Sequence, residues 1–227
     1  GFILSSLFSY LWLKEIIKSE KAAFFGALFY TWAPYRFSLI YVRASLSELL
    51  AYTFVPFALF SLTRLSKKTN LKWLAISALS IASIMLAQNL VALITLPVLF
   101  LYCLLLALFS KSKKYLLFAP LSFAWASLIS AITYAPSLFE RDLVRFQETI
   151  SHAYVNHFVT PFQLIRSPWG YGFDFPGTVN DEMSFQLGLA HILVFLISIF
   201  LLSALVLRKN TTLKRITNSL VADPDKK

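Results

Sequence analysis

The chain contains little charge, little glycine and a single cysteine. Of its 227 residues, 14% are charged and 58% are hydrophobic, and only 6 are Gly. Soluble domains carry about 25% charged and 45–50% apolar residues, so an ordinary soluble fold is excluded. The lone Cys103 excludes an intrachain disulfide and a cysteine metal cluster. What remains is an aromatic, strongly apolar composition, which predicts an all-α, polytopic helical membrane protein.

Long runs without charge predict where the chain crosses the membrane. Asn89–Ser110, Tyr115–Phe139 and Met183–Leu207 contain no Lys, Arg, Asp or Glu. About 20 apolar residues suffice to cross a hydrocarbon core, so each of these runs can span it. The uncharged run Trp73–Ser110 is too long for one crossing and predicts a helical hairpin that turns at Gln88-Asn89.

Three less ideal runs are also candidate spans. They are Phe2–Leu13, Ala22–Pro34 and Leu49–Thr63, and they bring the expected total to about seven crossings. Charged side chains that flank such short runs must reach the membrane interface. The chain opens on Gly1 inside an apolar run, and we interpret residues 1–227 as one membrane domain from a longer chain.

The distribution of the basic residues is a topology signal. Every Lys falls in one of four places, which are Lys14–Lys21, Lys67–Lys72, Lys111–Lys114 and the tail 208–227. Even numbers of crossings separate these places, so the positive-inside rule predicts that all four are cytoplasmic in a multi-pass protein of the cell (plasma) membrane. The net charge of +10 is therefore no sign of a nucleic-acid partner. The segments 35–48 and 140–186 are then external.

The first external segment, 35–48, reads YRFSLIYVRASLSE and follows Pro34, which should end the preceding helix. A rough apolar stripe predicts a short amphipathic helix in which Arg36 and Arg43 share a face. These arginines either hold an anionic lipid headgroup by forked hydrogen bonds, or reach ordinary phospholipid, or pair with Glu48. Glu48 itself is either a favourable charge at a helix N-terminus or a site residue.

The second external segment is long and rich in aromatic residues, which predicts an ordered loop. Its first part, Leu143–Phe158, is expected to be helical. His152 and His157 are spaced poorly for a shared metal, so no metal site is expected. The stretch SPWGYGFDFPG, Ser167–Gly177, combines glycine turns with aromatic rings that either face a sugar or lipid chain or form an interfacial belt. His191, near the start of the last span, is interpreted as a hydrogen-bonded interface residue.

Two stretches resemble bacterial membrane proteins labelled 6-pyruvoyl-tetrahydropterin synthase-related. Tyr30–Leu59 carries their pattern of Pro-Tyr-Arg, Tyr-x-Arg and Glu, and Ser167–Ile192 is similar to their later external loop and following span. The matching positions are Pro34, Tyr35, Arg36, Tyr41, Arg43, Glu48, Trp169, Gly170, Tyr171 and Gly172. The architecture of that family resembles the GT-C glycosyltransferases, which use polyprenyl-phosphate sugars. The chain has no soluble domain and no zinc histidine triad, so pterin synthase chemistry is not expected.

The resemblance implies transfer of a sugar from a polyprenyl-phosphate donor at the outer membrane face, in cell-envelope glycan synthesis. Glu48 is the candidate catalytic residue, and the candidate substrate-binding residues are Tyr35, Arg36, Arg43, Trp169, Tyr171 and Asp174. Arginines would hold the donor phosphate and a carboxylate would deprotonate the acceptor, in one outward-facing cavity and without a cofactor. GT-C enzymes usually carry a catalytic acid in the first external loop, which would precede Gly1. The alternatives are a transporter or flippase for a lipid-linked or anionic substrate, and a non-catalytic assembly subunit.

Overall fold

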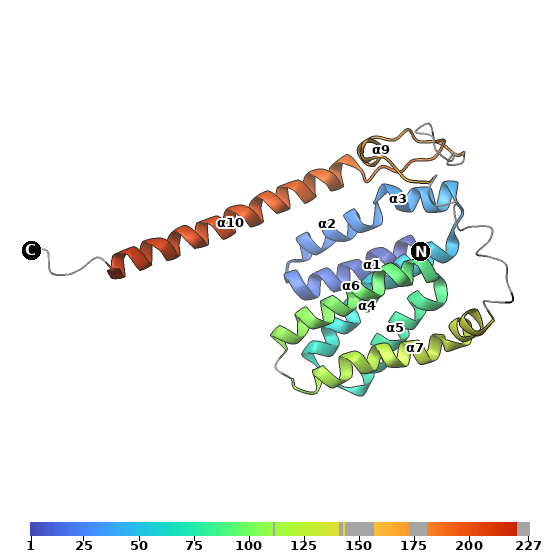
Figure 1. Cartoon of the computed structure of the whole chain (residues 1–227), viewed down its shortest axis with the longest axis horizontal. Helices are drawn as coiled ribbons and strands as arrows, with labels where there is room; N and C mark the ends of the chain where they lie inside the picture. The colour runs from blue at the N-terminus through green and yellow to red at the C-terminus, as the bar shows by residue number, and fades with distance from the viewer. Residues whose placement is uncertain (111, 141–142, 144–156, 173–180, 222–227) are drawn as a thin grey trace, which may run out of the picture.

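Helices carry the architecture throughout the described part of the chain. The computed structural model describes residues 1–110, 112–140, 143, 157–172 and 181–221, and none of these lies in a β-strand (Figure 1). The elements are α1 (Phe2–Ile17), α2 (Glu20–Thr31), α3 (Pro34–Phe37), the π-helix η1 (Ser38–Val42), α4 (Leu46–Lys67), α5 (Leu71–Ala87), α6 (Asn89–Phe109), α7 (Tyr115–Phe139), α9 (Pro161–Ile165) and α10 (Leu189–Val221). The predicted all-α class is confirmed for these residues.

Side-chain caps fix several helix boundaries. The side-chain oxygens of Ser19 and Asn70 accept hydrogen bonds from backbone N–H groups at the starts of α2 and α5. Gln88, which is extended with φ −159, does the same for α6. Such oxygens satisfy N–H groups that have no partner inside the helix. The predicted hairpin is confirmed, because α5 ends at Ala87 and α6 begins at Asn89.

The core lies where α5 contacts both α4 and α7, with α1 packed against α4 and α2 against α1. Its largest fully buried side chains include Leu62, Leu65, Leu74, Ile81 and Ile84. Small residues let the helices approach closely, as small side chains do between membrane helices. Across the α4–α5 contact, the hydroxyls of Ser61 and Ser80 lie 3.0 Å apart and share a hydrogen bond.

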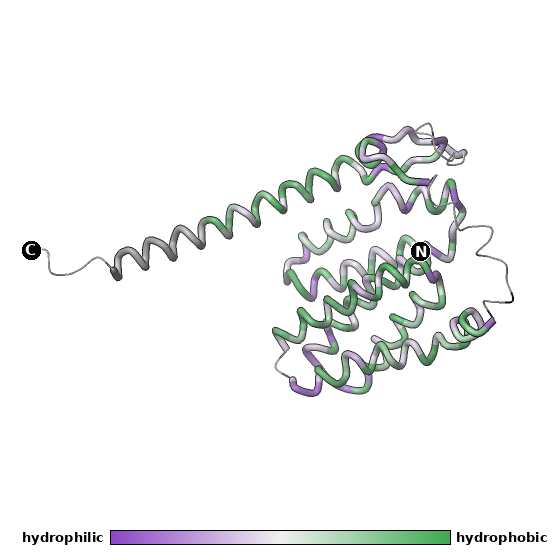
Figure 2. Tube along the Cα trace, viewed as in Figure 1, coloured by the Kyte–Doolittle hydropathy of each residue, from purple (hydrophilic) through white to green (hydrophobic). Residues whose placement is uncertain are grey.

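Three helices, α4, α6 and α7, are long and apolar enough to cross a membrane, and α5 and Leu189–Leu205 form shorter apolar helices. α6 and α7 coincide with two of the predicted spans. Apolar residues run along their outward faces, where Leu93 and Phe109 are exposed (Figure 2). Soluble monomers rarely expose such surfaces, so these faces are suited to lipid. The total of about seven crossings stays a prediction, because α1 and α2 have only 16 and 12 residues.

The last helix differs from its prediction at both ends. A span from Met183 was expected, but α10 begins at Leu189. The preceding residue, Gly188, has φ +93 and lies so close to the ring of Pro34 that a side chain there would overlap it. Glycine adopts this left-handed conformation readily. A residue in this conformation does not continue a right-handed helix, so α10 does not extend toward the N-terminus past Gly188. At its other end α10 continues to Val221, through most of the expected tail, and extends away from the bundle in Figure 1.

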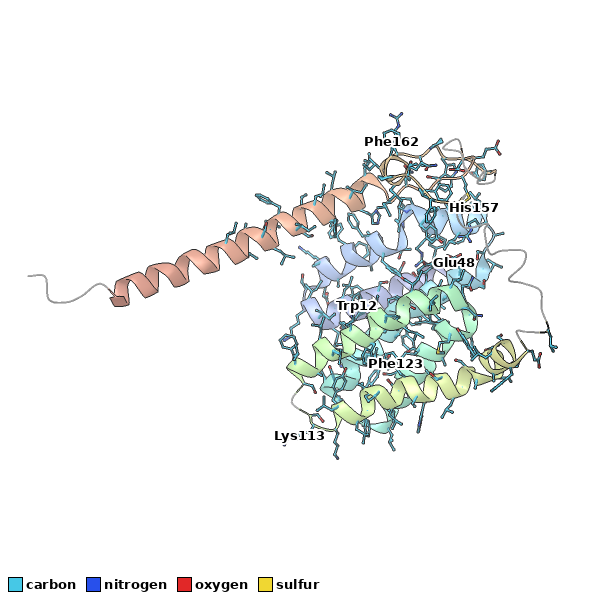
Figure 3. All side chains as sticks on the ribbon, in the orientation of Figure 1. Trp12, Glu48, Lys113, Phe123, His157 and Phe162 are labelled. Carbon is cyan, nitrogen blue, oxygen red and sulfur yellow. The ribbon has the colours of Figure 1, made fainter. Side chains whose placement is uncertain are left out.

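The Lys-rich connections gather at one end of the bundle, called the lysine end below. Lys67 Nζ donates to Glu15 Oε1 at 2.7 Å, and Ser110 Oγ donates to the Ser66 carbonyl at 3.2 Å. These contacts bring together the connections that follow α1, α4 and α6. Figure 3 shows Lys113 at this end and Glu48 at the opposite one, the Glu48 end. Which end is cytoplasmic stays a prediction.

Candidate functional site

The segment 35–48 does not form the single amphipathic helix expected for it. Pro34 starts α3 at its first position, the chain continues as η1, and the helix breaks at Ala44, whose φ is +48. A π-turn changes the helical period, and a left-handed residue ends the helix. Arg36 and Arg43 therefore lose the face they were expected to share. Arg36 is buried, whereas the side chain of Arg43 is 42% exposed.

A cavity of about 470 Å³ lies among α1, α2, α3 and α4, beside the first turn of α10. Its wall is mainly aromatic and aliphatic, from Trp12, Phe29, Tyr30, Tyr52, Val55 and Leu59. Arg36, Tyr35 and His191 are polar residues that also contribute to its lining. Small-molecule sites have volumes of about 300–1,000 Å³ and combine apolar walls with a few polar groups, so the cavity has the form of a ligand site.

Arg36 is the only Arg, Lys, Asp or Glu in the described lining of this cavity. It is 4% exposed, and its Nε, Nη1 and Nη2 atoms have no hydrogen-bond partner among the described residues. Its guanidinium carbon lies 5.3 Å from the centre of the Phe2 ring and 5.1 Å from that of Tyr30. Burial lowers the pKa of the guanidinium, and the nearby Tyr30 hydroxyl opposes this. The group stays charged, because arginine does not lose its proton in proteins.

A hydrogen-bonded triad of Tyr35, Arg43 and Glu48 adjoins the cavity. The Tyr35 hydroxyl donates to Glu48 Oε1 at 2.5 Å and accepts from Arg43 Nη1 at 3.0 Å. Arg43 Nη1 also lies 3.2 Å from Glu48 Oε2. Glu48 is 6% exposed and stands in the first turn of α4, where the helix dipole favours a carboxylate. Glu48 is therefore both a helix N-terminal charge and the partner of Arg43, which leaves Arg36 as the arginine without a carboxylate.

Tyr35 belongs to both the cavity and the triad. Its ring lines the cavity and meets the Tyr52 ring edge-on, with 6.1 Å between the ring centres. Its hydroxyl points the other way, to Glu48 and Arg43. Tyr35 thus contacts both the cavity and the carboxylate of Glu48.

Trp169 and Tyr171 line a second hollow, of about 600 Å³. The rest of its described lining consists of Pro168, Gly170, Gly172, Asp181 and Glu182. No residue lines both hollows, so the expectation of a single cavity is wrong for the described residues. The candidate Asp174 lies outside the described residues, as do His152 and most of Leu143–Phe158.

The second hollow nevertheless lies near η1, at the end of the bundle where Arg36 lines the first cavity. Ser38 Oγ of η1 donates to the Ser184 carbonyl at 3.2 Å, and the Leu187 N–H donates to the Leu164 carbonyl of α9 at 2.9 Å. Figure 1 shows α9 and its neighbouring loop beside α3. The structure thus brings Tyr35, Arg43 and Glu48 into contact. The loop that carries Trp169 lies nearby, but it lines the second hollow and not the Arg36 cavity.

Sequence reasoning missed Trp12, Tyr30 and Tyr52 as lining residues. Their only signal is a polar atom on an aromatic ring inside an apolar run, which interfacial belt residues share. His191 is better predicted, because its Nε2 shares a hydrogen bond of 2.8 Å with the Phe29 carbonyl. The hydrogen bond expected of His191 is confirmed, its place at the membrane interface stays a prediction, and the same residue lines the Arg36 cavity.

Comparison with protein-family models, with curated proteins and with solved structures gives no significant match. The resemblance to the pterin-synthase-related membrane proteins and to GT-C enzymes therefore stays a prediction. Function has to be argued from the two hollows and the triad.

Proposed function

We propose that the chain is a membrane domain of a GT-C-like glycosyltransferase that takes a sugar from a polyprenyl-phosphate donor at the outer face of the plasma membrane, for cell-envelope glycan synthesis. One observation carries the proposal: Arg36, whose buried guanidinium has no carboxylate partner among the described residues, lines an apolar cavity. A ligand with an anionic head and a hydrocarbon tail complements both features.

A buried cation without a partner is energetically unfavourable. Its lost hydration is offset only when an opposite charge and new hydrogen bonds replace the water. The faces of the Phe2 and Tyr30 rings offset part of the lost hydration energy, since cation–π contacts contribute about 0.5–2 kcal/mol. A phosphate supplies the rest through paired, charge-assisted hydrogen bonds to the planar fork of Arg36. The site therefore favours a phosphate over a neutral head.

The same geometry suits glycosyl transfer. The bond between the anomeric carbon and the phosphate oxygen breaks, its electron pair leaves with the phosphate, and Arg36 stabilises the growing negative charge. The acceptor hydroxyl attacks the anomeric carbon, and its proton passes to a carboxylate. Glu48 is the candidate base, because it accepts a hydrogen bond from Tyr35, whose ring lines the cavity.

The test of the lipid-phosphate site is binding of polyprenyl phosphate to the purified chain in nanodiscs. Arg36→Gln should weaken binding about 10–150-fold, which corresponds to about 1.5–3 kcal/mol for a hydrogen bond to a charged group. Arg36→Lys should recover only part of the affinity, because Lys lacks the planar fork.

Arg64→Gln is the matched control, because Arg64 also lies between two aromatic rings but at the lysine end. This variant should bind polyprenyl phosphate normally. Wild-type affinity in Arg36→Gln would contradict the proposal. Transfer of a labelled sugar from the lipid to an acceptor, lost in Glu48→Gln while lipid binding persists, would distinguish an enzyme from a lipid-binding protein.

A transporter or flippase is the second candidate, and the irregular chain between α2 and α4 favours it. α3 is a single turn, η1 is a π-helix and Ala44 is left-handed. Discontinuous helices beside a binding site are typical of transporters. Reconstituted vesicles separate the candidates, since a flippase moves a labelled lipid phosphate between leaflets without any sugar acceptor.

A further inference from the structure

The hollow beside Trp169 differs from the Arg36 cavity in its charge. Its described lining includes two carboxylates, Asp181 and Glu182, and no Lys or Arg. Trp169 is 43% exposed, and its ring meets the Tyr171 ring edge-on with 6.3 Å between the centres. An anionic head would be repelled here, while a neutral group rich in hydroxyls finds acceptors beside aromatic faces.

Two glycines bring Glu182 against the aromatic loop. The Gly172 N–H donates to the Glu182 carbonyl at 3.1 Å. A Cβ at Gly172 would overlap the Glu182 carboxylate, and a Cβ at Gly170 would overlap the Glu182 carbonyl. Only residues without a side chain permit this approach. The two glycines therefore allow Glu182 to approach the loop that carries Trp169 and Tyr171.

The other carboxylate anchors the hollow. Asp181 is buried, and its Oδ2 accepts a hydrogen bond from Gln163 Nε2 at 2.5 Å. Gln163 also belongs to the capping box that starts α9, with Thr160 as its partner. Asp181 thus fixes the loop to α9, whereas Glu182 is exposed on the hollow.

We propose that this hollow is a saccharide-binding subsite, in which a sugar ring packs against Trp169 and Tyr171 and its hydroxyls donate to Glu182. The C–H groups of a sugar ring form an apolar face that suits an aromatic ring, and its hydroxyls suit a carboxylate acceptor. The inference rests on the proposed function in assigning the sugar as the acceptor. It divides the substrates between two hollows, with the lipid-linked donor at Arg36 and the acceptor sugar at Trp169.

The test titrates a panel of neutral di- and trisaccharides against the purified chain in nanodiscs, with tryptophan fluorescence and calorimetry as readouts. Saturable binding by at least one sugar is expected. Trp169→Ala should weaken it about tenfold through loss of the aromatic face, and Glu182→Gln should weaken it several-fold through loss of a charged acceptor. The matched control is Trp32→Ala, because Trp32 is also exposed and meets the Phe37 ring edge-on.

Polyprenyl phosphate binding is measured on the same variants, so that the two proposals fail separately. Trp169→Ala and Glu182→Gln should keep normal lipid-phosphate affinity. Loss of lipid binding in Arg36→Gln with sugar binding intact supports the subsite. The proposal is overturned if no sugar of the panel binds, or if Trp169→Ala binds sugar like the wild type. Quenching of Trp169 by brominated lipid without sugar binding would assign the ring to the membrane interface instead.

Discussion

Two arginines of this chain lie between pairs of aromatic rings, one at each end of the bundle. At the lysine end, the guanidinium carbon of Arg64 lies 5.5 Å from the Phe60 ring centre and 5.7 Å from that of Trp73. Its Nε is 3.4 Å from Glu15 Oε2. At the Glu48 end, Arg36 has similar aromatic neighbours but no ion pair with a carboxylate among the described residues.

The difference separates an arginine with a carboxylate partner in the fold from an arginine for which we propose an anionic ligand. Glu15 neutralises Arg64 and also accepts a hydrogen bond from Lys67, so this cluster joins α1 to α4. The buried carboxylate at the opposite end, Glu48, is occupied by Arg43 and Tyr35. Arg36 keeps a full charge in an apolar setting, which is favourable only when a ligand supplies the anion.

The largest expected effect is an all-or-none difference in accessibility between the two ends. Cysteines at Lys113 and at Tyr171, each in a Cys103→Ser background, should react with an impermeant thiol reagent from opposite sides of the membrane. Right-side-out and inverted vesicles provide the measurement. Labelling of both positions from one side would contradict the assigned topology.

The next largest effect concerns the free energy of unfolding, which should respond differently when a charge is removed at each of the two arginine sites. Glu15→Gln should lower the free energy of unfolding by about 1–3 kcal/mol, because it leaves Arg64 without its anion. Arg36→Met should leave the ligand-free protein equally stable or more stable, since it removes an unpaired buried charge.

Thermal unfolding of both variants in nanodiscs, without added lipid phosphate, measures this difference. Arg64→Met combined with Glu15→Gln is the control and should recover part of the loss, because the pair is then removed as a unit. Equal destabilisation by Arg36→Met and Glu15→Gln would mean that Arg36 has a structural partner.

The smallest expected effect concerns the side chain shared by the cavity and the triad. Tyr35→Phe removes the hydroxyl from Glu48 and Arg43 but keeps the ring in the cavity wall. It should lower the free energy of unfolding by about 0.5–1.5 kcal/mol and leave polyprenyl phosphate affinity unchanged. A large loss of lipid affinity in this variant would place the triad, and not the cavity, at the centre of ligand binding.

The sequence predicted α6, α7 and the break at Gln88 closely. Uncharged runs of this length have few alternatives, since backbone N–H and C=O groups in lipid must be satisfied within the helix. The start of α10 was not predicted, because the run without charge continues back to Met183, and a single glycine at position 188 does not by itself fix a helix boundary. The helix begins after Gly188, which meets Pro34, a residue far away in the sequence.

The candidate site was predicted as a set of residues but not as an arrangement. Tyr35, Arg36, Arg43 and Glu48 follow from their charge and aromatic character beside Pro34. Helical periodicity placed the two arginines on one face, and the π-turn of η1 with the break at Ala44 separated them. Sequence spacing therefore could not show which of the two arginines pairs with the Glu48 carboxylate.

Composition and the spacing of charges determined, by themselves, that this chain is helical, apolar on its outside and basic in its connections, because lipid leaves the backbone few other choices. Tertiary structure decided which polar groups meet. It paired Glu48 with Arg43, paired Glu15 with Arg64 and left Arg36 against a cavity. The pairing of Glu48 with Arg43 depends on the local break at Ala44. The other outcomes depend on how α1, α2 and α4 pack against one another, since a buried charge takes its partner from whichever helix lies beside it.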